Sequence, residues 1–287
     1  MRVFLFKFIM GFFARLSLSW NHKLGAGLGW LMAKMNTRLY QTVVKNVLQC
    51  YPAEEAPVQQ RFMRATIQET AKTITEMGPM WWWPQDRVLG LVVNVSGKAV
   101  LDRAMADGRG VILAAPHLGA WELIGLYCSA HYPMTSLYRP PRMAALDPIV
   151  RQARQRGGAT LVPTDNHGVK KLLKALKKRE MIAILPDQEP KKGTGMFAPF
   201  FNQPAYTMIL LSRLAQKTQA AVIFSFAERL PNGAGYHVHF MAGDAEIADR
   251  DMAISVAAVN RGVERCIQQC PTQYQWSYKR FRLKPNT

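Results

Sequence analysis

The chain has 287 residues, with 37 Lys and Arg against 19 Asp and Glu, and a formal net charge of +18 at pH 7. This length is ample for a large buried core, and a composition of 49% hydrophobic and 20% charged residues excludes both a disordered chain and a polytopic membrane protein. The basic excess must face something anionic: nucleic acid, anionic lipid, a phosphorylated substrate or an acidic protein.

The first 20 residues are mostly apolar but are interrupted by Arg2, Lys7 and Arg15. The uncharged run at 8–14 is short, whereas a spanning helix needs about 20 apolar residues. We therefore expect a membrane anchor over residues 1–30, either tilted through the bilayer or lying in the headgroup region. An ordinary core helix is the alternative. The three tryptophans at 81–83 suit a bilayer interface, a core or a substrate wall equally.

Beyond residue 45 the apolar residues alternate between helical and strand spacing. A helix is expected over 57–77, where Gly78-Pro79 would stop it, and a second helix would be capped by Ser96 and ended by Gly108. Further strands are expected at 111–115, 134–138, 159–162, 181–185, 221–226 and 236–241, and further helices at 120–130, 147–156, 168–179, 204–217 and 251–269. This alternation predicts a single α/β domain over 45–287, with a largely parallel central sheet flanked by helices.

The cysteines and histidines give little sign of a metal centre. Cys50, Cys128, Cys266 and Cys270 have no C-x-x-C spacing, so we expect buried, reduced thiols. His237 and His239 would share one face of a strand, but the sequence marks no third ligand. We therefore expect no metal site.

The clearest chemical pattern follows the strand at 111–115. His117 and Glu122 stand five residues apart, after Pro116 and around Gly119. On one continuous helix their side chains would diverge by about 140°. A turn at Gly119 would let them meet, so that the carboxylate orients the imidazole as a general base. A core histidine beside a helix-start glutamate is the alternative.

The sequence does not favour a protein nucleophile. There is no G-x-S-x-G motif, and the nearest thiol, Cys128, lies further down the expected helix. We therefore expect His117 to deprotonate a hydroxyl of the substrate, which then attacks an activated carbonyl without a metal.

The His117–Glu122 block resembles the H-x4-D/E motif of the glycerolipid and lysophospholipid acyltransferase superfamily. Further blocks follow in the order and approximate spacing of one branch, at 137–142, 146–148, 185–188, 195–201 and 270–281. The last block is similar to the signature P-x-Q-Y-x-W-x-x-[KR]-R-[FW]. That branch is the lipid A biosynthesis lauroyl/myristoyl (secondary) acyltransferases of Gram-negative bacteria, and the match covers nearly the whole chain.

This resemblance implies an inner-membrane enzyme of glycerolipid acyltransferase-like fold, with its catalytic domain on the cytoplasmic side. The implied reaction moves a fatty acyl chain, lauroyl-like, from acyl carrier protein to a hydroxyl of a 3-hydroxyacyl chain on a phosphorylated lipid A precursor, without a cofactor. His117 would be the general base and Glu122 its partner. Further residues implied to hold the acceptor's phosphosugar or line the pocket are Arg139, Arg142, Asp187, Gly195 and Phe197.

The charge of the chain agrees with these partners, because the carrier protein, the lipid A precursor and an anionic inner-membrane leaflet are all negative. The helix from 168 to 178 carries five lysines opposite a leucine stripe. It could dock the carrier or the membrane, or simply face solvent. Two alternatives remain: another phospholipid or glycolipid acyltransferase of the superfamily, and a non-catalytic basic protein that binds membrane or nucleic acid, although nucleic acid is not the expected partner.

Overall fold

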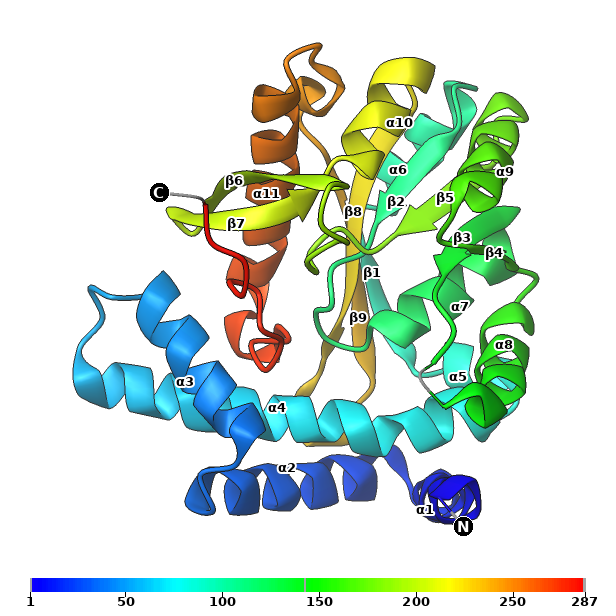
Figure 1. Ribbon diagram of the computed structural model, residues 1–287. Helices are drawn as coiled ribbons and strands as arrows, with labels where there is room; N and C mark the ends of the chain where they lie inside the picture. Colours follow the sequence, from blue (N-terminus) through cyan, green and yellow to red (C-terminus); the bar gives the residue numbers. More distant parts are fainter. Residues whose placement is uncertain (1, 142, 286–287) are drawn as a thin grey trace.

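A seven-stranded sheet forms the centre of the computed structural model, which describes residues 2–141 and 143–285 (Figure 1). Its strand order is β1-β9-β8-β2-β5-β3-β4. The strands are β1 (Val92–Ser96), β2 (Val111–Ala114), β3 (Met134–Tyr138), β4 (Thr160–Pro163), β5 (Met181–Ile184), β8 (Ala221–Arg229) and β9 (Tyr236–Ala242). The five strands from β8 to β4 are parallel, while β9 is antiparallel to β8 and parallel to β1. The predicted α/β sheet is confirmed.

Helices cover both faces of the sheet because its central strands are apolar on both sides. All four residues of β2 are buried, and they alternate between two hydrophobic clusters. One cluster packs against α9 (Asn166–Lys177), α10 (Leu210–Thr218) and α11 (Met252–Gln269). The other packs against α5 (Gln85–Leu89), α6 (Lys98–Ala106) and α7 (Trp121–His131).

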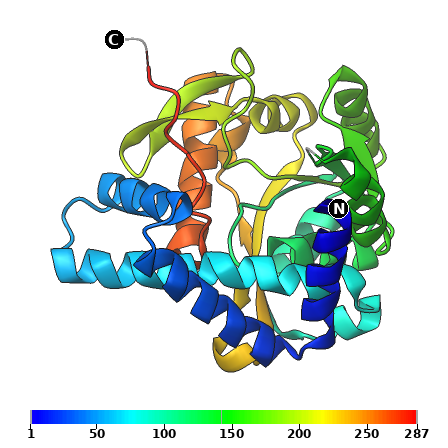
Figure 2. The ribbon, with the colours of Figure 1, turned by 60° about the horizontal axis from the view of Figure 1, so that its bottom comes forward.

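The helices ahead of α5 in the chain are α1 (Arg2–Arg15), α2 (Leu18–Lys34), α3 (Arg38–Cys50) and α4 (Ala56–Trp82). The long α4 runs across one end of the sheet, and α1 and α2 lie on its far side (Figures 1 and 2). In residues 2–141 and 143–285, no helix combines the length and the apolar character needed to cross a bilayer.

The helix predicted to stop at Gly78-Pro79 continues to Trp82, so that prediction is wrong. A side chain at Gly78 would collide with Met10 and Phe13, which shows that α1 crosses α4 at this point. The contact with α1 and the burial of Met80 outweigh the local preference of Pro79 against helix.

Two other expectations differ from the structure. Ser96 ends β1 instead of capping a helix, and Gly97, with φ 73°, leads into α6. The helix expected at 204–217 begins only at Leu210, because the preceding residues form a hairpin of β6 (Gly195–Phe200) and β7 (Gln203–Met208). Its two turn residues have positive φ, as a tight hairpin requires. The four cysteines are free and buried, as expected.

Candidate active site

His117 stands in the loop that joins β2 to α7, at the carboxyl edge of the parallel strands. The backbone of this loop is held on both sides. The His117 carbonyl accepts a hydrogen bond from Gln275 N (3.0 Å), and Ala120 N donates to the Ala227 carbonyl (2.8 Å). Gly119 has φ 60°, and a Cβ there would collide with the same Ala227 carbonyl, so the loop requires glycine.

Asp187 holds the imidazole of His117. Ala114 is paired with Ile184 in the β2–β5 ladder, and His117 and Asp187 each follow by three residues. Asp187 Oδ1 lies 2.9 Å from His117 Nδ1, and Oδ2 accepts from the backbone N–H of His117 at 2.9 Å. Burial alone would raise the pKa of Asp187, but His117 and its hydrogen bonds lower that pKa below its ordinary value. The Asp187 side chain is therefore ionised and holds His117 by two hydrogen bonds, one to the ring and one to the backbone.

The predicted contact between His117 and Glu122 is not formed. Glu122 lies in the first turn of α7, which turns its carboxylate away from the loop and toward α8 (Asp147–Gln155). There it accepts from Arg154 Nε (3.0 Å) and Nη2, in bidentate geometry. Burial would raise the pKa of Glu122, but the Arg154 guanidinium lowers it. Asp187, which sequence reasoning placed among the substrate-binding residues, takes the position expected of Glu122.

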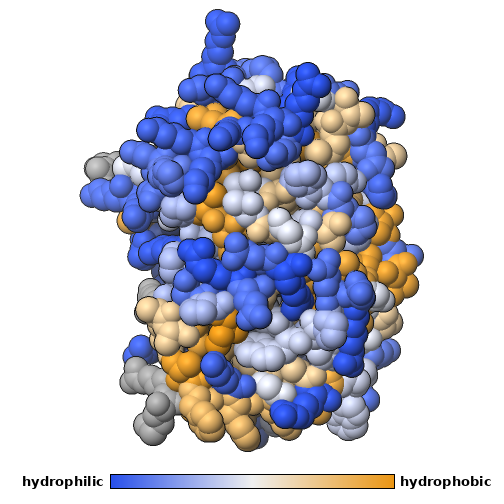
Figure 3. Space-filling model, turned by 90° about the vertical axis from the view of Figure 1, so that its right-hand side faces the viewer, coloured by the Kyte–Doolittle hydropathy of each residue, from blue (hydrophilic) through white to orange (hydrophobic). Residues whose placement is uncertain are grey.

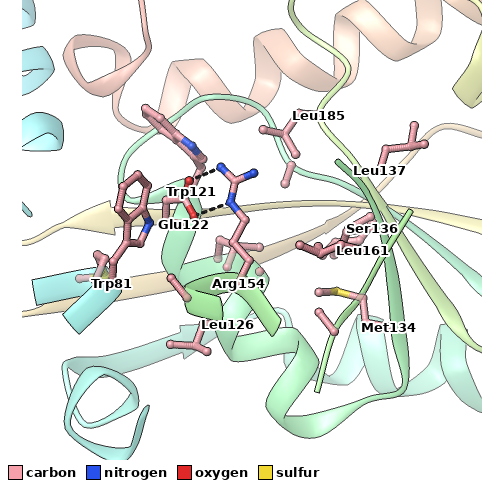
Figure 4. A pocket seen from close by; sticks show the side chains of 18 residues that line it. Trp81, Trp121, Glu122, Leu126, Met134, Ser136, Leu137, Arg154, Leu161 and Leu185 are labelled. Carbon is pink, nitrogen blue, oxygen red and sulfur yellow. Dashed lines mark hydrogen bonds and ion pairs between the residues drawn. The ribbon is translucent and has the colours of Figure 1, made fainter. Parts of the chain in front are cut away.

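An apolar pocket begins at the Glu122–Arg154 pair and runs under α7, and its wall approaches His117 at Trp121 (Figure 4). Its empty volume is ≈ 720 Å³, a figure that includes space open to solvent. Trp121, whose ring centroid lies 5.2 Å from that of His117, stands with Trp81 near the Glu122–Arg154 pair, and Met134 and Leu161 lie further along. Most of the remaining wall is aliphatic: Leu113, Ala115, Ile124, Leu126, Leu137, Ala153, Ala159, Ala183 and Leu185.

The remaining predicted site residues are dispersed. Arg139 is exposed directly after β3 and makes no ion pair with any residue that the structure describes. Gly195 and Phe197 belong to β6 and are not part of the pocket wall. Arg142 lies outside the described residues. Roles for Arg139, Gly195 and Phe197 in binding the acceptor stay predictions.

The C-terminal block frames both site loops. Gln273 exchanges two hydrogen bonds with the backbone of Arg229, at 2.8 and 3.0 Å. Gln275 accepts from the Gln188 side chain at 3.1 Å, directly beside Asp187. Sequence reasoning found this block but not its task, which is to fix the backbone around the His117–Asp187 pair. It missed Arg154 altogether, since an arginine late in a surface helix carries no local signal.

Basic side chains lie at both the carboxyl and the amino ends of the strands. Arg139, Lys191 and Lys192 are exposed and follow β3 and β5 at the carboxyl edge, where His117 stands. The lysines of α9 are also exposed, but Lys171 and Lys174, with Lys178 directly after the helix, border a depression at the amino ends of β3, β4 and β5. Figure 3 shows hydrophilic residues over the upper part of this face, where α9 lies. These lysines thus lie at the amino ends of the strands, whereas His117 lies at the carboxyl ends.

The arrangement can perform general base chemistry. Asp187 occupies Nδ1 of His117, and no group in the described part of the chain hydrogen-bonds Nε2. The side chain of His117 keeps 14% of its surface exposed, so a substrate hydroxyl can reach the free nitrogen. One nitrogen of this imidazole is hydrogen-bonded to a carboxylate, and an apolar cavity that could hold a fatty chain lies nearby. Such an arrangement is suited to acyl transfer to a hydroxyl.

Comparison with known proteins agrees with this chemistry. The family model described as bacterial lipid A biosynthesis acyltransferase matches residues 1–283. The chain is 27% identical over 265 residues to lipid A biosynthesis lauroyltransferase of Escherichia coli K12, covering 92% of this chain and 86% of that protein. It is 28% identical over 266 residues to lipid A biosynthesis palmitoleoyltransferase of the same organism (91% and 85%). A lipid A biosynthesis acyltransferase of Haemophilus influenzae is 27% identical over 268 residues (92% and 84%).

The fold, the site and these matches define an enzyme of the acyltransferase class. Within that class, the chain belongs to the bacterial lipid A biosynthesis acyltransferase family. The resemblance seen in the sequence motifs is thereby confirmed, and the non-catalytic alternative is set aside.

Proposed function

We propose that the enzyme transfers a fatty acyl chain, lauroyl-like in length, from acyl carrier protein to a hydroxyl of a 3-hydroxyacyl chain on a phosphorylated lipid A precursor. The observation that carries this proposal is the clamped His117 beside an apolar pocket. The membership of the chain in a lipid A acyltransferase family supports the acceptor.

In the proposed reaction, His117 Nε2 takes the proton of the acceptor hydroxyl as its oxygen attacks the thioester carbonyl of the donor. The resulting tetrahedral intermediate collapses with cleavage of the C–S bond, and the imidazolium returns the proton to the departing thiolate. Asp187 keeps Nδ1–H oriented and stabilises the positive charge on the ring during the transfer. Acyl-O-ester and free carrier thiol are the products, so atoms and charge balance.

The apolar pocket is suited to binding the acyl chain. The carboxyl ends of the strands are suited to binding the charged parts of both substrates. Arg154, oriented by Glu122, supplies the polar end of a mostly apolar cavity. Arg139, Lys191 and Lys192 offer cations for phosphate or for an acidic carrier at the edge where the reaction takes place. The α9 lysines lie at the other edge, which favours solvent exposure over carrier docking for that helix.

The location proposed for the enzyme is the inner membrane, with the catalytic body on the cytoplasmic side. Support comes from α1 and α2, which expose large apolar side chains together with Lys7, Arg15, Lys23 and Lys34. Phe-, Leu- and Trp-bearing helices with basic residues bind the headgroup region of anionic bilayers.

The test is turnover of acyl carrier protein thioester with a phosphorylated lipid A precursor, using detergent-extracted full-length enzyme. We expect His117→Ala to reduce kcat by about 10²–10⁴ because a positioned general base is lost. The control is His131→Ala, which removes an exposed imidazole from α7. Full turnover by His117→Ala would remove the histidine from the mechanism. A clear preference for a lysophospholipid acceptor would point to another branch of acyltransferases.

A further inference from the structure

Three potential metal ligands gather on the β8–β9 hairpin, away from the pocket. Glu228 of β8 is directly opposite His237 of β9 in the antiparallel ladder. His239 follows two residues later on β9 and therefore lies on the same face of the sheet. The sequence marked only the two histidines, and the hairpin register brings the missing third group to them.

The geometry of this cluster is close to that of a coordinated ion. One ligand atom from each residue, an imidazole nitrogen or a carboxylate oxygen, lies within 4.8 Å of the others. Glu228 Oε2 and His239 Nε2 are 3.1 Å apart, and the two imidazole centroids are 3.9 Å apart. Ligand atoms in a tetrahedral zinc site are about 3.3 Å apart, from bond lengths of about 2.0–2.1 Å. Small side-chain rotations would complete the site.

The surroundings pre-orient the two imidazoles. Phe226 stacks on His239 with centroids 4.5 Å apart and planes 9° apart. Ser96 Oγ lies 2.7 Å from His237 Nε2, from the neighbouring strand β1. All three side chains are partly exposed, which leaves room for water as a further ligand.

We propose that Glu228, His237 and His239 bind one Zn²⁺ ion. Two imidazoles and a carboxylate form a donor set that zinc accepts, with an open fourth position. None of the three residues lines the apolar pocket, so the ion would lie apart from the acyl-transfer site. It would fix the end of β8, where the adjacent Arg229 donates to the Gly119 carbonyl at 2.9 Å in the His117 loop. This proposal does not depend on the acyl donor or acceptor.

The experiment uses untagged full-length enzyme in detergent, stripped with a chelator, because a polyhistidine tag would bind the same ions. Zn²⁺ is titrated by calorimetry, and Co²⁺ is used as a spectroscopic substitute whose visible absorption reports its coordination. We expect one ion per chain and a higher melting temperature with Zn²⁺. His237→Gln and His239→Gln should each weaken Zn²⁺ binding at least tenfold, and Glu228→Gln should alter the Co²⁺ spectrum.

The matched control is His167→Ala, which removes an exposed imidazole from α9 and should leave binding unchanged. Melting curves without metal establish that each glutamine variant folds like the parent protein. The proposal is overturned if the parent chain binds no Zn²⁺, or if a folded His237→Gln/His239→Gln double variant binds it as tightly as the parent. Neither result would bear on the acyl-transfer assay, so the two proposals fail separately.

Discussion

At the scale of single residues, the orientation of His117 depends on an acceptor with two oxygens. Asp187 accepts from the ring nitrogen with one oxygen and from the backbone N–H with the other. An amide at this position has one acceptor and one donor, so it can satisfy the backbone only by presenting its NH₂ to Nδ1. That contact would place the ring proton on Nε2, where the mechanism needs a free lone pair.

Asp187→Asn should therefore lower kcat by about 10²–10⁴ with little change in KM, as expected when a histidine is held in the wrong tautomer. Glu122→Gln is the comparison, because it changes the same carboxylate chemistry in the residue that pairs with Arg154. Steady-state kinetics on both variants decide between the two carboxylates. If Glu122→Gln loses kcat as a base-orienting residue would while Asp187→Asn retains it, the assignment made from the structure is wrong.

The sequence marked His117 as a candidate base but did not predict that Asp187 contacts its ring, for a reason visible in the chain. His117 and Glu122 are near in sequence, and local spacing directed attention to them. Asp187 is 70 positions away from His117, and what unites them is that each follows a proline, three residues past paired positions of adjacent strands. The repeated strand-x-Pro-polar pattern was present in the sequence. It predicts a contact between the two polar residues only when β2 and β5 are known to be neighbouring strands.

At the scale of elements, a buried ion pair ties α4 to the sheet and to the site loop. Arg229 at the end of β8 donates to Glu76 of α4 through Nε (2.8 Å) and Nη2. Tyr236 and His22 also bond the same carboxylate, at 2.9 and 3.3 Å. Because Arg229 also holds the Gly119 carbonyl, the position of α4 is coupled to the backbone beside His117.

Glu76→Gln should destabilise the protein by about 3–5 kcal/mol near neutral pH, because it leaves the buried Arg229 without a counter-charge. Burial would raise the pKa of Glu76, but Arg229 and the hydrogen bonds outweigh it and lower that pKa to about 2. Because folding lowers the pKa of Glu76, its ionised carboxylate stabilises the fold at pH values above the ordinary pKa of 4.5. This stabilisation is lost as the pH falls from 4.5 toward about 2.

The difference in unfolding free energy between the parent and Glu76→Gln should accordingly shrink as pH falls from 4.5 toward about 2. Denaturation followed by circular dichroism across that range measures it, with the exposed Glu55→Gln as control. A gap that stays constant with pH would mean that Glu76 is not ionised in the folded protein.

The elements themselves were predictable where apolar periodicity is strong and local, as in β3 and α11. Prediction failed where a contact from elsewhere decides, as at Gly78, where α1 crosses α4. The glycines at 25 and 29 show the same effect. Both are buried in α2, where a Cβ would collide with the α4 backbone. From the sequence alone, glycines that allow two helices to pack closely cannot be told apart from glycines with another role.

At the scale of the whole molecule, one side carries an apolar surface built from α1 and α2. Phe4, Phe8 and Phe12 recur every fourth residue on α1 with 76%, 68% and 47% of their surfaces exposed. Trp20 and Trp30 of α2 are more than half exposed, and each carries a lysine over its ring. Figure 3 shows hydrophobic residues gathered at the lower left of that face, where α1 lies. Soluble surfaces rarely gather so many large apolar side chains.

This apolar surface adjoins the pocket. The ring of Phe6 in α1 lies 6.2 Å from Trp81, which is part of the pocket wall at the end of α4. A bilayer in contact with α1 would therefore lie next to the cavity, and a lipid acceptor could reach His117 without leaving the membrane surface entirely. The N-terminal helices, packed on α4 through close glycine contacts, would then set the distance between membrane and site.

Placing charge on this surface should separate membrane delivery from chemistry. We expect Phe4→Glu/Phe8→Glu to reduce sedimentation with anionic phospholipid vesicles at least tenfold, because each buried aromatic side chain contributes about 1.5–3 kcal/mol and glutamate is repelled by the leaflet. Turnover of a vesicle-embedded acceptor should fall in parallel, while turnover of the acceptor in detergent micelles should stay near the parent value. The control is Ile254→Glu, at an exposed apolar position near the start of α11, on the opposite side of the molecule (Figure 1). Unchanged sedimentation of the double variant would show that the basic surface alone holds the enzyme on the membrane, and equal losses in vesicles and micelles would place α1 in the catalytic fold instead of at its lipid interface.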